Sequence, residues 1–292
     1  MTNRVLIVDG MALLFRHFYA TSLHNQFMYN SKGIPTNGVQ GFVRHIFSAI
    51  KEINPTHVAV CWDMGQQTFR NEMFEGYKQN RPEPPAELIP QFDYVKEISQ
   101  QFGFVNIGVT NYEADDVIGS LAHTYSDNNE VFIITGDRDI LQCITENVEV
   151  WLTKKGFTIY NRYTLDRFKN EYGLEPKQLI DVKAFMGDTA DGYPGVKGIG
   201  EKTAIKLIQN HHSVENVIQN ISTLIPAQQK KINDNINNLH LSKSLAEIHT
   251  QVPLESEQLF NEMAYAHELN EILSICNEHE LYVSGKYLAS NF

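Results

Sequence analysis

Short aliphatic runs that lead into acidic residues recur through the first half of the chain. Residues 4–8 (RVLIV) precede Asp9, residues 57–62 (HVAVCW) precede Asp63, and residues 130–134 (EVFII) precede the motif T-G-D-R-D. Near-continuous aliphatic runs of this length are typical of strands buried on both faces, as in parallel sheets. Because the carboxyl ends of parallel strands meet at one ligand-binding edge, the pattern predicts a parallel sheet whose edge carries acids.

Helical periodicity fills the intervals between these runs. Residues 39–53 carry apolar side chains at spacings of three and four after Asn37, a candidate helix cap, and residues 113–125 form a second such segment. A weaker strand-like run lies at 104–109. The alternation predicts an α/β fold with a mostly parallel central sheet flanked by helices, and we assign this first domain to residues 1–170.

Two segments depart from the alternation. Residues 64–90 carry basic residues and prolines without an apolar stripe, which is more typical of a functional loop than of a core element. Beyond residue 170 the periodicity becomes helical, over 176–186, 201–211 and 226–247. We therefore predict a second, helical domain over residues 171–292.

Composition narrows the class of protein. The 292 residues, 42% of them hydrophobic, are enough for two domains with sizeable cores. Cys61, Cys143 and Cys276 are widely spaced and odd in number, which disfavours both a zinc site and a disulfide framework. No apolar run approaches the roughly 20 residues of a membrane helix, and Asp9 interrupts the N-terminal apolar stretch before it could serve as a signal peptide. We expect a soluble, cytoplasmic protein without a membrane partner.

Nine acidic residues could meet at the predicted sheet edge: Asp9, Asp63, Glu113, Asp115, Asp116, Asp137, Asp139, Asp188 and Asp191. Each has a simpler alternative. Acids after strands are often helix caps, acids in the first turn of a helix interact favourably with the helix dipole, and aspartates form turns. Nine gathered carboxylates repel strongly, however, and hard divalent cations relieve that repulsion. A set without His or Cys suits Mg²⁺ or Mn²⁺, and two such ions can promote in-line hydrolysis of a phosphodiester.

A glycine cluster, P-G-V-K-G-I-G-E-K-T-A at 194–204, lies in the helical region. It is close to a phosphate-binding Walker motif, but Glu201 stands where the lysine should be and the preceding segment is a loop. The cluster instead predicts a tight turn between two helices whose backbone amides face a phosphate, as in helix-hairpin-helix elements that bind duplex DNA without reading its sequence. Nearby lysines either add positive charge or simply form a solvated face: Lys183, Lys197, Lys202 and Lys206.

With these motifs in view, the chain resembles the bacterial 5′-nuclease family, the flap endonuclease-like fold of the nuclease part of DNA polymerase I and its free-standing relatives. The shared motifs are L-I-V-D-G at 6–10, W-D at 62–63, Y-K-Q-N-R at 77–81, E-A-D-D at 113–116, T-G-D-R-D at 135–139, G-D-T-A-D at 187–191 and the glycine cluster at 194–204. The resemblance implies a PIN-like 5′-nuclease fold in its free-standing form. It also implies a helical arch at about 64–90 and a C-terminal helix-hairpin-helix domain.

The resemblance assigns the acids to two metal groups. The first group is Asp9, Asp63, Glu113 and Asp115, and the second is Asp116, Asp137, Asp139, Asp188 and Asp191, with Asp115 near both. Some free-standing relatives lack part of the second group. All nine acids are present here, which indicates a competent nuclease rather than a degenerate binder.

The resemblance also implies that the 5′ single strand passes through or under the arch. Lys78 and Arg81 match basic residues near the scissile phosphate, where they would offset developing negative charge, and we count them with Asp115 as catalytic. Tyr77 matches an aromatic residue that stacks on a nucleotide, with packing as the alternative. Arg70 fits the same basic face as a phosphate contact.

Further DNA contacts are expected on either side of the arch. Phe15-Arg16 stands where many relatives have a tyrosine before the arginine, so the tyrosine hydroxyl is lost while Arg16 could still contact a phosphate. In the glycine turn the expected DNA contacts are Lys197, Gly198, Gly200, Lys202 and Thr203. The family's turn also holds a K⁺ ion through backbone carbonyls, which the resemblance transfers to Gly195, Val196, Gly198 and Gly200.

Together these features predict a structure-specific, metal-dependent 5′-nuclease. It would act as a 5′-3′ exonuclease and flap endonuclease near single-strand/double-strand junctions of DNA, by a two-metal-ion mechanism, in replication or repair. DNA with 5′ flaps is the expected partner, RNA-primed DNA a further one, and a monomer the expected state. Two alternatives stay open. A non-catalytic junction-binding protein would need only the helical domain, and a two-metal phosphatase would leave the glycine turn and residues 70–81 unexplained.

The net charge does not contradict a DNA substrate. The chain has 24 Lys and Arg against 35 Asp and Glu, a formal charge of −11 that taken alone argues against nucleic acid. Without the nine acids of the predicted metal edge the balance is −2. Much of the negative excess therefore belongs to the predicted cation-binding edge, and the distribution of charge is more informative than its sum.

Overall fold

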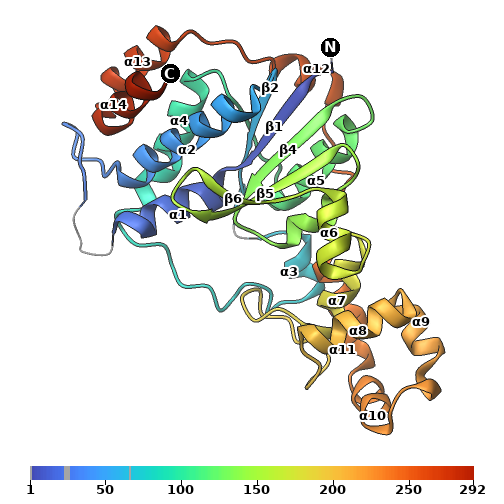
Figure 1. The fold of residues 1–292 in the computed structure, drawn as a ribbon. Coiled ribbons are helices and arrows are strands. Elements are labelled where there is room, and N and C mark those ends of the chain that lie inside the picture. Colours follow the sequence, from blue (N-terminus) through green and yellow to red (C-terminus); the bar gives the residue numbers. More distant parts are fainter. Residues whose placement is uncertain (1, 23–26, 66) are drawn as a thin grey trace.

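The computed structural model describes residues 2–22, 27–65 and 67–292. In these residues six strands form one sheet in the order β3-β2-β1-β4-β5-β6 (Figure 1). All neighbouring pairs are parallel except β5 and β6, which are antiparallel. The strands are β1 (Arg4–Asp9), β2 (His57–Cys61), β3 (Val105–Ile107), β4 (Glu130–Thr135), β5 (Val148–Lys155) and β6 (Ile159–Tyr163). The predicted mostly parallel sheet is confirmed.

The parallel register brings the carboxyl ends of the central strands together. Asp9 at the end of β1 pairs with Cys61 of β2, and Val8 pairs with Ile134 of β4. The chain leaves β2 and β4 at this same edge. The acids that follow each strand therefore start from one side of the sheet, where open α/β folds bind their ligands.

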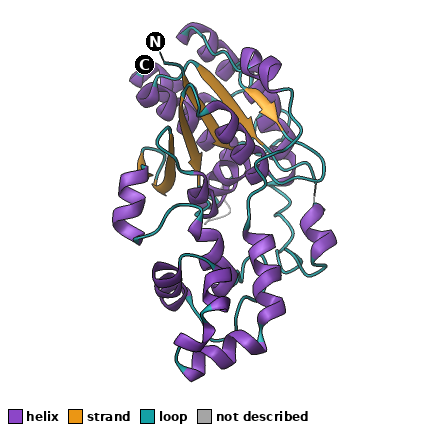
Figure 2. Cartoon of the chain, turned by 90° about the vertical axis from the view of Figure 1, so that its right-hand side faces the viewer, coloured by secondary structure: helices purple, strands orange, loops and turns teal. Residues whose placement is uncertain are grey.

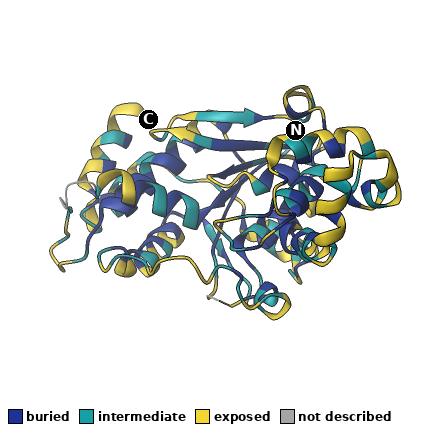
Figure 3. Ribbon diagram, turned by 90° about the horizontal axis from the view of Figure 1, so that it is seen from below, coloured by how far each residue is buried: buried dark blue, intermediate teal, exposed yellow. Residues whose placement is uncertain are grey.

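Helices cover both faces of the sheet, on the left and right of it in Figure 1. Alternate residues of β1 belong to two apolar layers. Seen from below, the central strands and the inner helix faces are buried, while the outer helix faces are exposed (Figure 3). One layer contains α5 (Ala114–Tyr125), the 3₁₀ helix η1 (Asp139–Cys143) and α6 (Leu165–Tyr172). The other contains α1 (Gly10–Thr21), α2 (Asn37–Ile53) and α4 (Ile89–Gln101).

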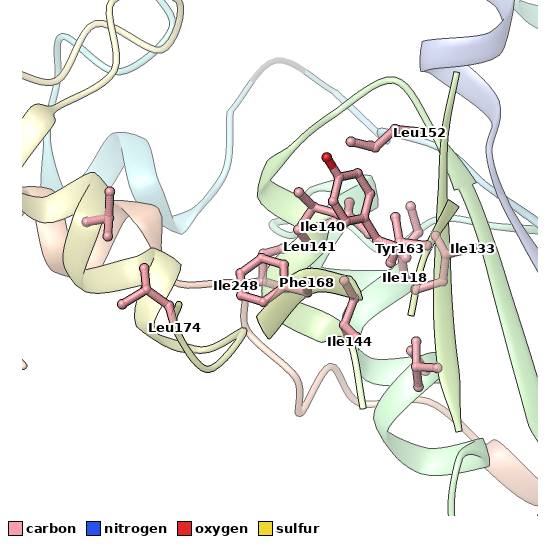
Figure 4. Packing of buried hydrophobic residues seen from close by; sticks show 14 of the residues in the cluster. Ile118, Ile133, Ile140, Leu141, Ile144, Leu152, Tyr163, Phe168, Leu174 and Ile248 are labelled. Carbon is pink, nitrogen blue, oxygen red and sulfur yellow. The ribbon is translucent and has the colours of Figure 1, made fainter. Parts of the chain in front are cut away.

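The first layer anchors the loop that carries two of the predicted metal ligands. Ile118 of α5, Ile133 of β4, Leu141 of η1 and Phe168 of α6 are buried in one cluster (Figure 4). Complete burial of each such side chain stabilises the fold by roughly 1.5–3 kcal/mol. The cluster holds both ends of the segment 135–139, so its aspartates are placed by the core rather than by the loop itself.

A helical bundle lies below the carboxyl edge of the sheet (Figures 1 and 2). Its elements are α7 (Gln178–Met186), α8 (Glu201–His211), α9 (Val214–Gln219), the 3₁₀ helix η2 (Ile221–Thr223), α10 (Pro226–Asp234) and α11 (Ile236–Ala246). The single helix predicted over 226–247 is two helices that meet at Asn235. Among the described residues, no helix is both long and apolar enough to cross a membrane.

The last part of the chain returns to the sheet unit. The backbone N–H of Tyr265 donates to Thr56, and the N–H of Val58 donates to Met263, so this segment adds an antiparallel bridge to β2. The helices here are α12 (Ser256–Glu262), α13 (Leu269–Glu278) and α14 (Tyr282–Asn291). Because α13 and α14 pack in the apolar layer of α2, residues 171–292 do not form one helical unit as the sequence predicted.

Three local expectations differ from the structure. Asn37 is the first residue of α2 and not its cap; its amide instead donates to Thr21, and Gln91 donates to it. Strands β5 and β6 were not predicted, because both are short of continuous aliphatic residues. Residues 64–90 were expected as a helical arch. Over the described residues 64–65 and 67–88 the one α-helix is α3 (Phe69–Met73), since the prolines that follow cannot continue a helix.

Candidate metal centre

A cleft of about 820 Å³ opens at the carboxyl edge of the sheet. Its acidic lining residues are Asp9, Asp63, Glu113, Asp115 and Asp137, which come from β1, α5 and the segments after β2 and β4. All five are predicted metal ligands, and the structure brings them together. An all-oxygen set of this kind is the chemistry that Mg²⁺ and Mn²⁺ prefer.

Asp9 serves as a helix cap and also faces the cleft. Its Oδ1 accepts from the backbone N–H of Ala12 at 2.9 Å, and its Oδ2 accepts from the Thr135 hydroxyl at 2.6 Å. Burial raises the pKa of Asp9 to about 6. The two hydrogen bonds lower this pKa, but they do not outweigh burial, and the negative charges of Asp63 and Asp137 raise it further. The cap therefore fixes the orientation of the carboxylate without removing its need for a cation.

Asp115 is buried among the other acids of the cleft. Burial raises the pKa of this carboxyl well above its ordinary value, and the neighbouring charges of Asp137 and Asp9 raise it further. Asp63 is held nearby because its Oδ1 accepts from the N–H of Ala114 at 2.8 Å, at the start of α5. A bound divalent cation would offset both the burial and the repulsion that now favour protonation of Asp115.

A second acidic cleft adjoins the first on the side of the helical bundle. Carboxylate oxygens of Asp139, Asp188 and Asp191 lie within 4.8 Å of one another. Asp137 lines both clefts and so lies between the two groups. Burial raises the pKa of Asp139 to about 6, and the charge of Asp137 adds to this effect.

Three basic side chains neutralise these acids in the structure. Lys78 Nζ lies 2.6 Å from Glu113 Oε1, and Arg81 Nη2 lies 2.6 Å from Asp191 Oδ1. Lys183 Nζ lies 2.7 Å from Asp139 Oδ1 and also pairs with Asp188. Burial acts to raise the pKa of Asp188, but the hydrogen bond and charge of Lys183 outweigh it and lower that pKa. The predicted catalytic residues Lys78 and Arg81 are thus at the acids.

The structure places Asp116 and Arg70 in a buried pair with each other and not in the lining of the two clefts. Arg70 is 2% exposed, and its guanidinium donates to both oxygens of Asp116, at 2.7 and 2.8 Å. Asp116 also accepts from the N–H groups of Glu113 and His249, and Arg70 donates to the carbonyls of Leu245 and Glu247. Asp116 has no free oxygen for a metal, and Arg70 cannot reach a phosphate. The pair instead joins α3 and α5 to the end of α11.

Tyr77 has the packing role rather than the predicted stacking role. It is 3% exposed, and its hydroxyl donates to Glu113 and lies 3.3 Å from Asp191. A buried ring cannot receive a nucleotide base. Its hydroxyl connects one acid of each metal group, a contact that no local sequence signal indicates.

The glycine turn has the close geometry that the sequence predicts. A Cβ on Gly195 would lie 2.3 Å from the nitrogen of Gly187, so only glycine fits, and Gly198 has φ +82°. Of the predicted contact residues, Lys197, Gly198, Gly200 and Lys202 are exposed and Thr203 is partly buried. The Gly198 carbonyl, a predicted K⁺ ligand, accepts a hydrogen bond from Lys231 Nζ at 2.9 Å. The neighbouring carbonyls of Val196 and Gly200 accept backbone N–H groups.

Some residues of the site are absent from the sequence predictions. Thr135 opens the motif T-G-D-R-D as the last residue of β4, and its hydroxyl donates to Asp9 at the end of the adjacent strand β1. The signal that could have found it is a hydroxyl at the carboxyl end of a predicted strand, next to a strand that ends in an acid. Lys183 was counted only as a nearby charge, although it lies between Asp139 and Asp188. Lys231 comes from α10, and nothing in its surrounding sequence indicates its contact with the turn.

Comparisons with known proteins match this arrangement over almost the whole chain. A family model described as "5'-3' exonuclease, N-terminal resolvase-like domain" matches residues 4–173, and one described as "5'-3' exonuclease, C-terminal SAM fold" matches residues 174–267. A 5'-3' exonuclease of Bacillus subtilis (strain 168) is 52% identical over 252 residues, which are 86% of this chain and 85% of that protein.

The chain is also similar to longer relatives in sequence and to a solved structure in fold. DNA polymerase I of Lactococcus lactis subsp. cremoris (strain MG1363) is 40% identical over 262 residues, 87% of this chain but 29% of the polymerase. A flap endonuclease of bacteriophage T5, solved as a pseudo-enzyme-product complex with DNA and metal ions, has a TM-score of 0.67 at 22% identity. That likeness covers 98% of both chains and shows the shared fold.

Proposed function

The chain is a member of the 5′-3′ exonuclease family, and we propose that it is a structure-specific 5′-nuclease cutting DNA near single-strand/double-strand junctions. The observation that carries this proposal is the pair of adjoining acidic clefts that share Asp137. DNA with 5′ flaps is the proposed substrate, in replication or repair in the cytoplasm. RNA-primed DNA as a substrate and the monomeric state stay predictions.

Two Mg²⁺ ions, with Mn²⁺ as the alternative, are the proposed cofactors. Asp9, Asp63, Glu113 and Asp115 would hold one ion, and Asp139, Asp188 and Asp191 the other, with Asp137 between them. When bound, the two ions would activate the attacking water and stabilise the leaving oxygen of an in-line displacement. The core and the cap at Asp9 already orient the acids around Asp9 and Asp137, whereas Lys183 would have to release Asp139 and Asp188 to the second ion.

Lys78 and Arg81 are proposed to contact the scissile phosphate. Both now pair with acids that we assign to the metals, Glu113 and Asp191. Once those carboxylates are engaged elsewhere, the two cations are free to face the substrate and to offset its developing negative charge. Residues 1–170 are the proposed catalytic domain, and the bundle with its glycine turn is the proposed duplex-binding part.

The test of this function is a product-size ladder from a 5′-labelled flap substrate in Mg²⁺ and again in chelator. We expect short 5′ products released near the junction, in Mg²⁺ only. Binding without cleavage would support the junction-binding alternative. Hydrolysis of a small chromogenic phosphoester that duplex DNA does not inhibit would support a phosphatase. Either result would overturn the proposal.

Mg²⁺ should stabilise the protein more at pH 7.5 than at pH 5. Because the pKa values of Asp9 and Asp139 are raised to about 6, the folded chain without metal holds protons that the unfolded chain has already released. Its free energy of unfolding therefore falls as the pH rises through this range. Mg²⁺ needs the ionised acids, so its stabilisation appears as they lose their protons. Thermal melts in chelator and in Mg²⁺ at both pH values measure this, and equal Mg²⁺ shifts would contradict it.

Potassium at the glycine turn stays a prediction, and Lys231 would compete with it for the Gly198 carbonyl. We expect the affinity of the wild-type protein for flap DNA to be nearly the same in K⁺ and Na⁺ at equal ionic strength. Lys231→Met should bind several-fold more tightly in K⁺ than in Na⁺. Lys230→Met is the matched control, because it removes the same charge from the neighbouring exposed position. Anisotropy titrations in chelator measure the affinities of the wild-type protein and of both variants. If the ratio of the affinities in K⁺ and Na⁺ were the same for Lys231→Met as for wild type, the competition would be disproved.

A further inference from the structure

The cleft at the sheet edge extends beyond its acids. Its far arm lies along α1 and α2 and against the turn between β5 and β6, where the lining residues include Phe15, Arg16, Tyr19, Arg44 and Phe157. No acid lines this arm in the part of the chain that the structure describes. One continuous cleft is therefore divided into an acidic end and an end that is basic and aromatic.

The two arginines of the arm keep an unneutralised charge. Arg44 Nε donates to the Gln40 carbonyl, and its guanidinium carbon lies 5.3 Å from the centre of the Phe157 ring. Arg16 Nε donates to the Gly156 carbonyl at 3.3 Å. Over the ranges 2–22, 27–65 and 67–292, neither arginine has a carboxylate within ion-pair distance. Two such guanidinium groups in one cleft, which contact the adjacent residues Gly156 and Phe157, suit phosphate oxygens.

The aromatic side chains of the arm offer a surface for stacking. Tyr19 is 48% exposed, and its ring lies 6.2 Å from that of Phe15 with only 17° between the two planes. Phe157, in the turn between β5 and β6, also lines the arm and is partly exposed. Exposed aromatic rings beside basic groups are how proteins hold single-stranded nucleic acid without reading its sequence, since every base has a face to stack.

The position of the arm indicates which part of the substrate it takes. The second acidic cleft adjoins the helical bundle, because its lining includes Tyr172, Leu179 and Glu201, whereas the arm lies on the other side of Asp9 and Asp137. Duplex held at the glycine turn would approach the acids from the bundle. Nucleotides beyond the scissile phosphate would then continue into the arm.

We propose that this arm is a subsite for the single-stranded nucleotides of the 5′ flap. Bases stack on Tyr19 and Phe15, and backbone phosphates pair with Arg16 and Arg44. This inference rests on the proposed nuclease function and adds to it a site outside the arch segment. It predicts that flap length, and not flap sequence, controls affinity until the arm is filled.

The test compares Tyr19→Leu with wild type on a nicked duplex without a flap and on flaps of increasing length. We expect KM for flaps of several nucleotides to rise about tenfold, the loss of one stacked base, with kcat unchanged. Turnover of the flapless nick should not change. Tyr282→Leu is the matched control, because Tyr282 is 61% exposed on α14 and outside the cleft.

A second measurement reports binding without hydrolysis. In chelator, 2-aminopurine placed in the flap should be quenched by the wild-type protein and not by Tyr19→Leu. For Arg44→Met, the slope of log affinity against log salt should fall by about 0.7 on a single strand, the loss of one phosphate contact. Equal losses of affinity for nicked and flapped substrates would show that the arm binds duplex. Unchanged affinity for both substrates would refute the subsite. Absence of all cleavage by wild type would instead refute the nuclease proposal.

Discussion

Asp137→Asn is expected to lower the rate of flap cleavage about a thousandfold while leaving the affinity for flap DNA unchanged or higher. Asp137 lines both acidic clefts, so the loss of its charge weakens both proposed ions at once. Stabilisation of transition-state charge by metal ions is worth several kcal/mol, and each 1.4 kcal/mol is about tenfold in rate. The amide still accepts a hydrogen bond from the N–H of Asp139, which Asp137 Oδ1 now receives at 2.8 Å, so the loop should keep its shape.

Single-turnover cleavage in Mg²⁺ and anisotropy with the same flap substrate in chelator measure the two effects separately. Asp127→Asn is the matched control, since Asp127 is an exposed acid beyond the C-terminal end of α5, whereas the cleft acids Glu113 and Asp115 are at its N-terminal end. It should cleave at the wild-type rate. A rate for Asp137→Asn within tenfold of wild type would show that the two clefts are not coupled through this residue.

Arg70→Met is expected to destabilise the protein by about 3–5 kcal/mol, because it leaves the carboxylate of Asp116 buried without its partner. Asp116 is 0% exposed, so solvent cannot replace the lost guanidinium. Lys169→Met, which breaks the exposed pair of Lys169 with Glu175, is the matched control and should cost less than about 1 kcal/mol. Chemical denaturation in chelator measures both.

A double-mutant cycle separates an ion pair from simple packing. The variant Arg70→Met/Asp116→Asn should lose less stability than the sum of the two single variants, because no unpaired charge stays buried. Strict additivity would show that Arg70 stabilises the fold through its stem alone. If Arg70 were instead a phosphate contact, Arg70→Met would weaken DNA binding at full stability, as the sequence had predicted.

The positions of residues that belong to a local sequence pattern were predictable, whereas the side chains that contact them in the folded chain were not. Asp9 and Asp63 follow aliphatic runs, and parallel pairing then places them at one edge whatever the details of packing. Arg70 and Asp116 looked like a phosphate contact and a metal ligand because exposure is not written in the local sequence. Their burial depends on the end of α11 closing over them, from more than a hundred residues further along the chain.

The path of the last helices shows the same limit. Amphipathic spacing predicted helices beyond residue 170, but a stripe of apolar residues does not say which surface it covers. Only the bridge between β2 and Ala264, with the burial of Ile272 and Leu288 beside α2, assigns α13 and α14 to the sheet unit.

By itself the sequence determined the parallel sheet, the acids at its edge and the glycine turn, because each depends on periodicity or on residues adjacent in the chain. The tertiary structure decided that Asp116 is neutralised in a buried pair while the other acids line the clefts, since that depends on Arg70, a cation distant in the sequence. It also decided that the acidic cleft continues into an arm with two arginines and exposed aromatic rings. The sequence gives the charge of a side chain, but whether that side chain is free to bind a ligand depends on what the folded chain packs against it.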